Sequence, residues 1–302
     1  MFYEYALEPA VVSNWERARY FLDAFAPWKG RFIAAYPKDW KRRVYDGLRC
    51  PDVEKKSIED RLARLDKRFF AARKGAPFDP SKSWADNALA ENQREAFRAV
   101  IVADSIVRGG NVLNAAVVDE TNPLWRVDQG RFAARDPATL RDALRLLLRL
   151  STRVALIDPF FRPHQRDKAL AFAAVSSSVS ADAKLEVHAR LGVQGDPTHH
   201  WFKEQCELHL PRWLPVGQDT LVHTWSQRPG GKRLHNRYLI TNIGGVKFGD
   251  SVEQGQEGED DHISILDESS REDLWSQFVD PAAAFDRIGT PVAVTGARRE
   301  RG

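Results

Sequence analysis

The spacing of apolar residues predicts mainly helices in the first half of the chain. Residues 53–75 place apolar side chains at helical spacing and end in a glycine, which is typical of an amphipathic helix and its stop. A leucine-rich helix is expected over 137–150, with Asp136 as its N-cap and a proline at its first position. Between them, an apolar, β-branched run at 96–106 predicts a strand, paired with a second one after Gly110. We therefore expect residues 1–135 to form a mostly helical N-terminal domain with a small strand element.

From residue 153 the pattern changes to strand, helix, strand, helix and then a run of strands. The segment RVALIDPFF has the continuous hydrophobicity of a strand buried on both faces. The elements expected after it are, in order, helix 166–178, strand 184–191, helix 198–210, strands 219–227, 233–241, 244–249 and 261–266, and helix 269–279. This order predicts an α/β fold, a mixed β-sheet flanked by helices, over residues 136–288. Residues 289–302 are expected to be a flexible tail.

Composition narrows the class of protein without indicating a function. A length of 302 residues suits two domains, and 43% apolar with 29% charged residues argue against a disordered chain. No apolar run approaches the roughly 18 residues that cross a bilayer. The first residues lack the basic and apolar parts of a secretory signal, so we expect a cytoplasmic protein. Two cysteines far apart in the sequence argue against a disulfide framework and against a cysteine-based zinc site.

The small net charge of +3 hides a separation of charges along the chain. Residues 228–237 carry four basic side chains and no acid, whereas residues 250–280 carry eleven acids and one arginine. Arg228, Lys232 and Arg233 therefore form a predicted basic patch suited to phosphate groups. The acidic segment is either a solvated loop or, if it overhangs the patch, a gate that competes with a nucleic-acid ligand.

The basic patch contains a short motif of chemically active residues, His235-x-Arg237, followed by Asn242. Residues two apart on a strand face the same side, so we expect the imidazole and the guanidinium to project together. An imidazole can attack phosphorus or move a proton, and a fixed cation beside it neutralises phosphate oxygens as charge develops on them. The pair holds the minimum parts of a phosphodiester site.

At these residues the chain resembles the phospholipase D superfamily, whose signature is H-x-K-x-x-x-x-D with a Gly-Ser pair six residues later. His235 matches the nucleophilic histidine, Arg237 stands at the phosphate-binding lysine, and Asn242 stands at the aspartate. Gly249 falls at the glycine position. The resemblance covers residues from about 150 to 280 and implies the fold of that superfamily for them, whereas residues 1–135 carry no such resemblance.

Three positions depart from the pattern of the superfamily. Arginine for lysine keeps the charge but presents a planar fork, and asparagine for aspartate removes a negative charge. Asp250 replaces the serine, and its carboxylate is unfavourable beside a phosphate unless it faces away or is protonated. Ser251 serves in its place if the turn is shifted by one residue.

The resemblance implies two alternative functions, because members of the superfamily use two such motifs and this chain has one. In the first, a homodimer or larger complex brings two copies of His235 together as a metal-independent phosphodiesterase or nuclease that needs no cofactor. In the second, the fold binds a nucleic acid, a partner protein or an anionic lipid without turnover, as in the C-terminal domain of MIT-domain proteins, which the chain also resembles. The combination of an N-terminal half without a recognisable family and a phospholipase D-like domain is similar to accessory components of bacterial anti-phage systems.

Two other groups of residues admit a functional or a structural interpretation. Glu186 and His188 face the same side of a predicted strand, but without a third ligand we predict no metal site. Trp40 lies among four basic residues in segment 38–43 and is either a core residue or a platform on which a base stacks. Cys206 lies on the apolar face of a predicted helix and is interpreted as a small core residue.

Overall fold

The computed structural model describes residues 1–103, 110–250, 252–279 and 284–297. The chain divides into two compact units, Met1–Asp128 and Gln129–Gly302. The predicted boundary after residue 135 is slightly late, because strand β6 (Gly130–Ala134) pairs with strand β12 (Asp260–Ile265) of the second unit.

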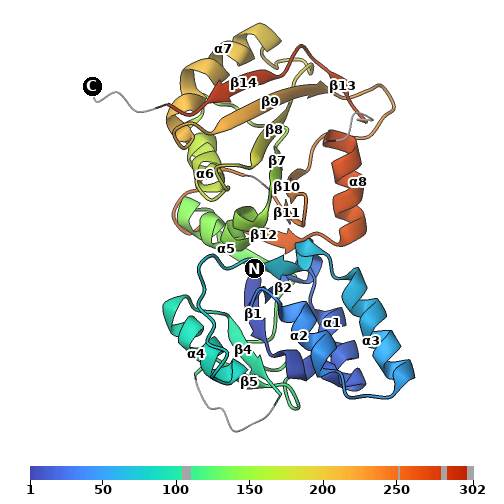
Figure 1. The fold of residues 1–302 in the computed structure, drawn as a ribbon. Helices are drawn as coiled ribbons and strands as arrows, with labels where there is room; N and C mark the ends of the chain where they lie inside the picture. The colour runs from blue at the N-terminus through green and yellow to red at the C-terminus, as the bar shows by residue number, and fades with distance from the viewer. Residues whose placement is uncertain (104–109, 251, 280–283, 298–302) are drawn as a thin grey trace. The chain divides into compact units, whose positions relative to one another are not determined.

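The first unit is built around a parallel sheet (Figure 1). Its described strands are β1 (Tyr3–Leu7), β2 (Arg31–Ala34), β3 (Phe70–Ala71), β4 (Ala99–Val102) and β5 (Val112–Asn114). Its described helices are α1 (Trp15–Ala24), α2 (Trp40–Gly47), α3 (Asp52–Arg64) and α4 (Trp84–Arg94), with 3₁₀ turns at Pro9–Ser13, Pro27–Lys29 and Lys67–Phe69. The strand order is β3-β2-β1-β4-β5, and every neighbouring pair is parallel.

Both faces of this sheet are buried, as parallel sheets require. Tyr5 and Leu7 of β1 belong to a core that includes residues of α1, α2 and α3. Ala6, between them, belongs to a separate core with residues of α4. The fully buried Trp40 also lies in the first core and donates its indole N–H to the carbonyl oxygen of Leu7, so of its two interpretations the structure selects the core residue.

The α/β class predicted for the protein is confirmed, but the description of its front half needs a correction. Helices do surround it, yet they cover a five-stranded sheet where only a small strand element was expected. The paired strands predicted at 96–106 and after Gly110 exist as β4 and β5, in parallel orientation. The other strands were missed because they are short and buried on both faces, which removes the alternation of polar and apolar residues that reveals a strand.

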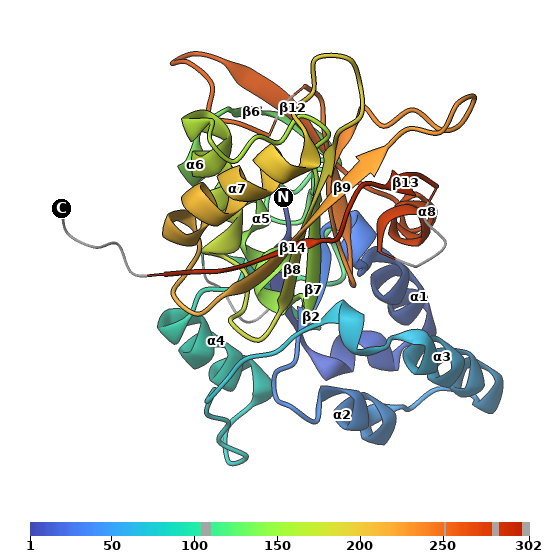
Figure 2. The same ribbon diagram turned by 90° about the horizontal axis from the view of Figure 1, so that it is seen from above.

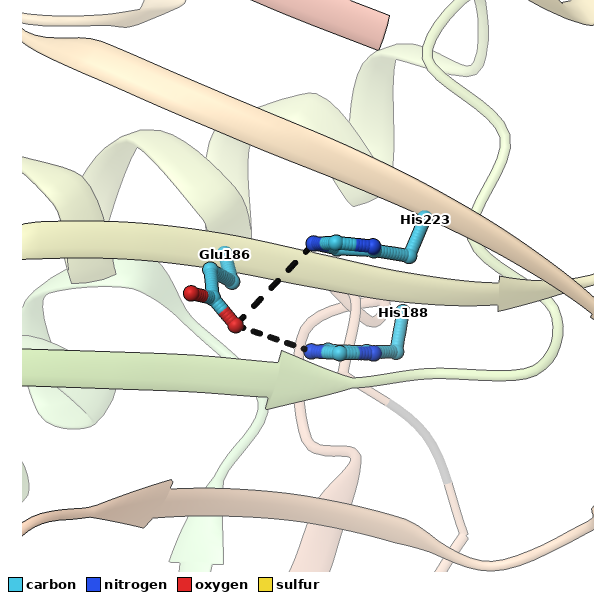
Figure 3. A group of neighbouring side chains, drawn as sticks. All are labelled: Glu186, His188 and His223. Carbon is cyan, nitrogen blue, oxygen red and sulfur yellow. Dashed lines mark ion pairs between the residues drawn. The ribbon is translucent and has the colours of Figure 1, made fainter. Parts of the chain in front are cut away.

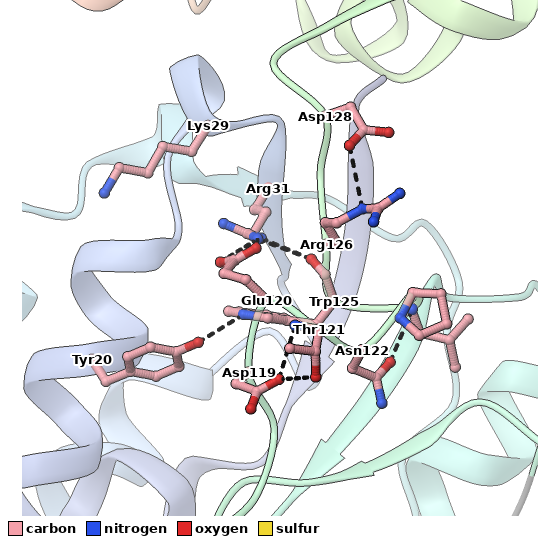
Figure 4. Close-up of polar contacts among 12 residues, drawn as sticks. Tyr20, Lys29, Arg31, Asp119, Glu120, Thr121, Asn122, Trp125, Arg126 and Asp128 are labelled. Carbon is pink, nitrogen blue, oxygen red and sulfur yellow. Dashed lines mark hydrogen bonds and ion pairs between the residues drawn. The ribbon is translucent and has the colours of Figure 1, made fainter.

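Polar contacts fasten the segment after β5 to the rest of the first unit (Figure 4). The guanidinium of Arg31 donates to the Glu120 carboxylate at 2.8 Å and to the carbonyl oxygen of Trp125 at 2.9 Å. The indole N–H of Trp125 donates to the Tyr20 hydroxyl at 2.8 Å, and its ring is fully buried. These contacts explain why the unit continues to Asp128 without further regular structure.

A cluster of buried charges joins β1, α4 and the segment after β3. Arg73 has a side chain that is 0% exposed, and it contacts the carboxylates of Glu4 at 2.7 Å and Glu91 at 2.8 Å. Arg94 binds the same Glu91 carboxylate at 2.6 Å. Burial by itself would raise the pKa of Glu91, but bonds from Arg94 and Arg73 more than offset it and lower that pKa. The cluster therefore stays ionised inside the unit.

The second unit holds a larger, mixed sheet. Its remaining described strands are β7 (Arg153–Ile157), β8 (Lys184–Arg190), β9 (Asp219–Ser226), β10 (Arg237–Thr241), β11 (Gly245–Phe248), β13 (Asp286–Arg287) and β14 (Val292–Thr295). Its described helices are α5 (Pro137–Leu150), α6 (Arg166–Ser176), α7 (His199–His209) and α8 (Glu268–Phe278), with a 3₁₀ turn at Leu210–Trp213. The strand order is β13-β9-β8-β7-β10-β11-β12-β6, and β14 also pairs with β9.

Strands β7, β8 and β9 run parallel, whereas β10, β11, β12 and β6 form antiparallel pairs. Figure 2 shows α5, α6 and α7 on one side of the sheet and α8 on the other. Leu274 and Phe278 of α8 share a core with Ala155 of β7 and Trp225 of β9. The mixed sheet flanked by helices that the sequence predicts is therefore confirmed for this half.

Several local predictions for the second unit are confirmed and two need correction. Asp136 caps α5 by accepting from two backbone N–H groups, and Cys206 is fully buried on α7. Strand β10 begins at Arg237, so His235 precedes the strand predicted to contain it. The predicted flexible tail from residue 289 contains β14, which is held in the sheet by antiparallel pairing with β9.

Across the described ranges, no helix combines the length and the apolar character that crossing a membrane requires.

Candidate functional site

The predicted motif lies at the edge of the second sheet where the parallel strands β7 and β8 end. Asp158, directly after β7, accepts the backbone N–H of Phe160 and so turns the chain at the strand end. Arg190 is the last residue of β8. Strand β10 runs antiparallel to β7 with Tyr238 opposite Ile157, which places Arg237 at this same edge. In open α/β sheets, ligands bind outside the carboxyl ends of the parallel strands.

The ring of Phe160 is the centre of this site. The guanidinium carbon of Arg237 lies 4.4 Å from the ring centroid, and that of Arg190 lies 4.9 Å from it. The imidazole of His235 meets the same ring edge-on, with centroids 5.5 Å apart. We call Phe160, Arg190, His235 and Arg237 the Phe160 cluster.

The positive charges of the two arginines in the Phe160 cluster are not neutralised by ion pairs. Among the residues that the structure describes, neither Arg190 nor Arg237 forms an ion pair, and the Nε atom of each is buried without a hydrogen-bond partner. Nη1 of Arg190 donates only a long hydrogen bond, 3.5 Å, to the carbonyl oxygen of Leu234. Buried donors without partners are costly, so this arrangement favours an anionic ligand that accepts from both arginines.

The surroundings of His235 lower the pKa of its imidazole. Loss of hydration lowers its pKa, and three neighbouring guanidinium groups lower that pKa further. These groups belong to Arg233, Arg237 and Arg190. A neutral imidazole keeps a lone pair and can act as a nucleophile or a base at neutral pH.

A carboxyl group and an ammonium group are buried next to the cluster. Asp158 is 0% exposed and lies 3.5 Å from the Lys168 ammonium of α6. Burial raises the pKa of Asp158, against the opposing charges of Lys168 and Arg237. Lys168 also pairs with Glu253 at 2.9 Å, and Glu253 pairs with Arg135 at 2.7 Å. Part of the acidic segment is thus engaged in ion pairs and is not freely solvated.

The structure brings some of the predicted site residues together and separates others. His235, Arg237 and Arg233 gather at the edge just described. Phe248, opposite Arg237 in the register of β10 and β11, places Gly249 and Asp250 at this edge too. Gly249 is required there because a Cβ atom would lie 2.6 Å from the Asp261 carboxylate.

Two predicted residues do not support the site, and two more are not engaged in it by any described contact. Asn242 lies at the other end of β10, where its side-chain oxygen accepts the backbone N–H groups of Thr152 and Arg153. Its role is to fix the start of β7, which corrects its grouping with His235. Arg228 is also corrected, because it binds the Asp286 carboxylate at 2.7 Å and is therefore not free for phosphate. Lys232 is exposed, and Ser251 lies outside the described residues.

Sequence reasoning missed Arg190 and Phe160, which contribute half of the Phe160 cluster. Both follow or end strands that the sequence predicts correctly. The rule that ligands meet the carboxyl ends of parallel strands would have indicated them, once β7 and β8 were recognised as parallel neighbours.

A second group of polar side chains is buried between β8, β9 and α8 (Figure 3). Glu186 and His188 of β8 and His223 of β9 offer ligand atoms that all lie within 4.8 Å of one another. The Glu186 carboxylate lies 3.5 Å from Nε2 of His188 and 4.0 Å from Nε2 of His223, and the two rings are stacked. The sequence predicts no metal site because Glu186 and His188 lack a third ligand. The structure supplies one in His223, so that reason was wrong.

The hydrogen bonds of this group nevertheless disfavour a metal. The indole N–H of Trp225, which can only donate, contacts Nδ1 of His188 at 3.0 Å. Neutral His188 therefore carries its proton on Nε2, the atom that a metal would need. If that proton moved to Nδ1, the N–H group there and the indole N–H would repel each other. The other oxygen of Glu186 already accepts from Arg153 at 2.7 Å. We interpret the group as a buried part of the core in which the ionised Glu186 pairs with Arg153, although both ring nitrogens of His223 and Nε2 of His188 are buried without a hydrogen-bond partner among the described residues.

Acid is expected to destabilise the second unit through these histidines. The pKa of His223 is lowered to about 4 by burial and then by His188, Arg287 and Arg153, against the opposing effect of Glu186, whereas an unfolded histidine has a pKa near 6.5. The folded state therefore binds fewer protons, and stability is lost as the pH falls below 6.5. Glu186 has a pKa of about 2, below its usual value of 4.5, so it stabilises the folded state at any pH above about 4.5. Its contribution to stability is lost only as the pH falls below that value.

Between pH 6.5 and 4.5 we expect His223 to remove about 2 kcal/mol from the free energy of unfolding. Urea denaturation at several pH values measures it. His223→Phe should flatten the pH dependence, whereas His200→Phe, at an exposed position of α7, should leave it as in the wild type. Identical slopes for all three proteins would show that His223 is not held neutral by burial.

No protein-family model matches the chain, and no curated protein sequence matches it either.

Proposed function

We propose that the Phe160 cluster binds a phosphodiester, most readily that of a nucleic acid, and that His235 acts on it as a nucleophile. One observation supports the proposal most. Two guanidinium groups without carboxylate partners, Arg190 and Arg237, meet beside a neutral imidazole on the same aromatic ring. Guanidinium groups match phosphate oxygens in geometry as well as charge, and the fork of each arginine can donate two bonds.

The proposed reaction needs a second imidazole. One copy of His235 attacks phosphorus, forming a nitrogen–phosphorus bond while the bond to the leaving oxygen breaks. The His235 of a second copy must hold a proton for this step and gives it to that oxygen; the negative charge of the bound phosphate opposes the guanidinium groups that lower its pKa. Water then attacks phosphorus, the nitrogen–phosphorus bond breaks, and the second imidazole recovers a proton from the water. Arg237 and Arg190 neutralise the phosphate oxygens throughout. The proposed enzyme is thus a homodimer of phospholipase D type.

A second candidate function is binding without turnover. Asp250 supports it, because it follows β11 at the sheet edge that Arg237 shares, and a carboxylate in place of the serine of the superfamily is unfavourable for a phosphate unless it faces away. The displacement of Asn242 from the site also supports it, since a part of the pattern on which catalysis was predicted is missing there. In this function the same arginines hold a nucleic acid or an anionic lipid, or take part in docking a partner protein, and His235 only contributes to the contact.

Binding is tested by replacing Arg237. Arg237→Gln removes one charge and one planar fork, so we expect affinity for a fluorescein-labelled single-stranded DNA or RNA to fall about tenfold. Fluorescence anisotropy at fixed salt measures the change. Arg237→Lys restores the charge and should recover most of the affinity, while thermal unfolding confirms that each variant is folded.

Arg228→Gln is the matched control, because Arg228 lies in the same basic segment but is already bound to Asp286. We expect its affinity to stay within about twofold of the wild type. Equal losses in Arg237→Gln and Arg228→Gln would contradict the proposed site and would indicate diffuse attraction by the basic segment.

A further inference from the structure

A hollow of about 290 Å³ opens on the first unit beside the carboxyl end of β2. Residues from segments 35–42 and 65–70 line it, which belong to the start of α2 and to the connection between α3 and β3. The volume is close to the lower end of the range for small-molecule sites, about 300 to 1,000 Å³. It suits a ligand of mononucleotide size.

The lining of this hollow is basic, and its acids are already engaged. Its charged residues are Lys38, Asp39, Lys41, Arg42, Asp66 and Lys67. Asp39 binds Arg42 at 2.7 Å and Arg43 at 2.9 Å, and Asp66 binds Arg68 at 2.8 Å. Among the described residues Lys38 and Lys67 form no ion pair, so they are available to an anion that enters.

The floor and wall of the hollow are apolar and aromatic. Phe70 is half-buried, and its ring packs at 5.8 Å between centroids against the buried Trp40. The ammonium group of Lys41 lies 5.4 Å from the Phe70 centroid and donates to the carbonyl oxygens of Leu62 and Leu65. These bonds fix Lys41 at the wall, so that a cation and an aromatic ring stand side by side.

The start of α2 adds a further attraction for anions. The side chain of Asp39 makes no capping hydrogen bond, although Asp39 occupies the N-cap position. The N–H group of Trp40 donates to the carbonyl oxygen of Pro37 at 2.9 Å, but the Asp39 side chain leaves the other first-turn N–H groups uncapped, so that they present a partial positive charge at the start of α2.

We propose that this hollow binds a small phosphate monoester that carries an aromatic group, such as a nucleoside monophosphate. The phosphate lies between Lys38 and Lys67, and the aromatic group contacts Phe70. The site is separate from the Phe160 cluster, which is in the second unit, and the proposal does not depend on the function of that cluster.

Isothermal titration calorimetry on the full chain tests the proposal, with adenosine monophosphate, inorganic phosphate and adenosine as probes. We expect adenosine monophosphate to bind best, because it alone uses both the cations and the ring. The double variant K38E/K67E should weaken its binding at least about tenfold. The double variant K55E/K56E makes the same charge change on the exposed face of α3, outside the hollow, and should bind within about twofold of the wild type.

Two further variants locate the ligand. Phe70→Leu should weaken adenosine monophosphate more than inorganic phosphate, because only the former contacts the ring. Arg237→Gln should leave the binding of adenosine monophosphate unchanged, which separates this hollow from the Phe160 cluster. Thermal unfolding of each variant confirms its fold.

Three results would overturn the proposal. The first is equal affinity for adenosine and adenosine monophosphate, and the second is an equal loss of affinity for adenosine monophosphate in K38E/K67E and K55E/K56E. The third is that no probe gives a measurable heat of binding. Binding of a single-stranded oligonucleotide that K38E/K67E abolishes, without binding of the monophosphate, would show a nucleic-acid surface in its place.

Discussion

Replacing His235 by alanine is expected to lower the rate of phosphodiester hydrolysis by a factor of about 1,000 or more, which corresponds to about 4 kcal/mol of activation free energy. The substitution removes the proposed nucleophile, and in a symmetric dimer it removes the proposed acid as well. Binding should change less than about threefold, because Arg190 and Arg237 remain in place. Hydrolysis of a chromogenic phosphodiester and of labelled DNA and RNA measures the rate.

The control for this prediction is His262→Ala. His262 is an exposed histidine of β12, in contact with the ring of Phe132. We expect its rate to equal that of the wild type. If wild type, His235→Ala and His262→Ala hydrolyse equally, or none hydrolyses any substrate, the catalytic part of the proposal fails and the binding function remains to be judged by Arg237→Gln.

A shared site also predicts how activity depends on the composition of mixed dimers. When wild-type chains and His235→Ala chains are co-expressed, only dimers with two intact imidazoles should be active. Activity should then fall with the square of the wild-type fraction, whereas a site complete in one chain gives a linear fall. Tandem affinity tags establish that mixed dimers form, and a linear result would contradict the two-imidazole mechanism.

The second large effect is expected on stability. Arg73→Ala should lower the free energy of unfolding of the first unit by about 3–5 kcal/mol, because it leaves the Glu4 and Glu91 carboxylates buried without their cation. Hydrogen-exchange mass spectrometry of peptides from residues 1–103 reports on this unit separately. Protection of β1 and α4 should fall most, since these elements carry the two carboxylates.

Arg68→Ala provides the matched control in the same unit. Its ion pair with Asp66 is partly exposed, with 29% and 46% of the two side chains accessible. We expect a loss of at most about 1 kcal/mol. Similar losses in Arg73→Ala and Arg68→Ala would show that the buried charge cluster adds no more than a surface pair.

Long, periodic elements were predictable from the sequence because their own residues carry the information. The leucines of α5 repeat at helical spacing, and Asp136 and Pro137 mark its start chemically. Strand β8 alternates polar and apolar residues over its seven positions. Strand β3, in contrast, has two residues and exists only because β2 lies beside it. No local pattern encodes such a strand.

The sequence by itself determined the α/β class, the order of elements in the second half, and a motif in which His235 and Arg237 stand together in a basic segment. The tertiary structure decided which partners that motif has. It brought Arg190 and Phe160 to His235, sent Asn242 to the far end of β10, and bound Arg228 to Asp286. The physical reason is that periodicity and spacing act over neighbouring residues, whereas the composition of a site depends on strand order and register, which link residues far apart in the chain.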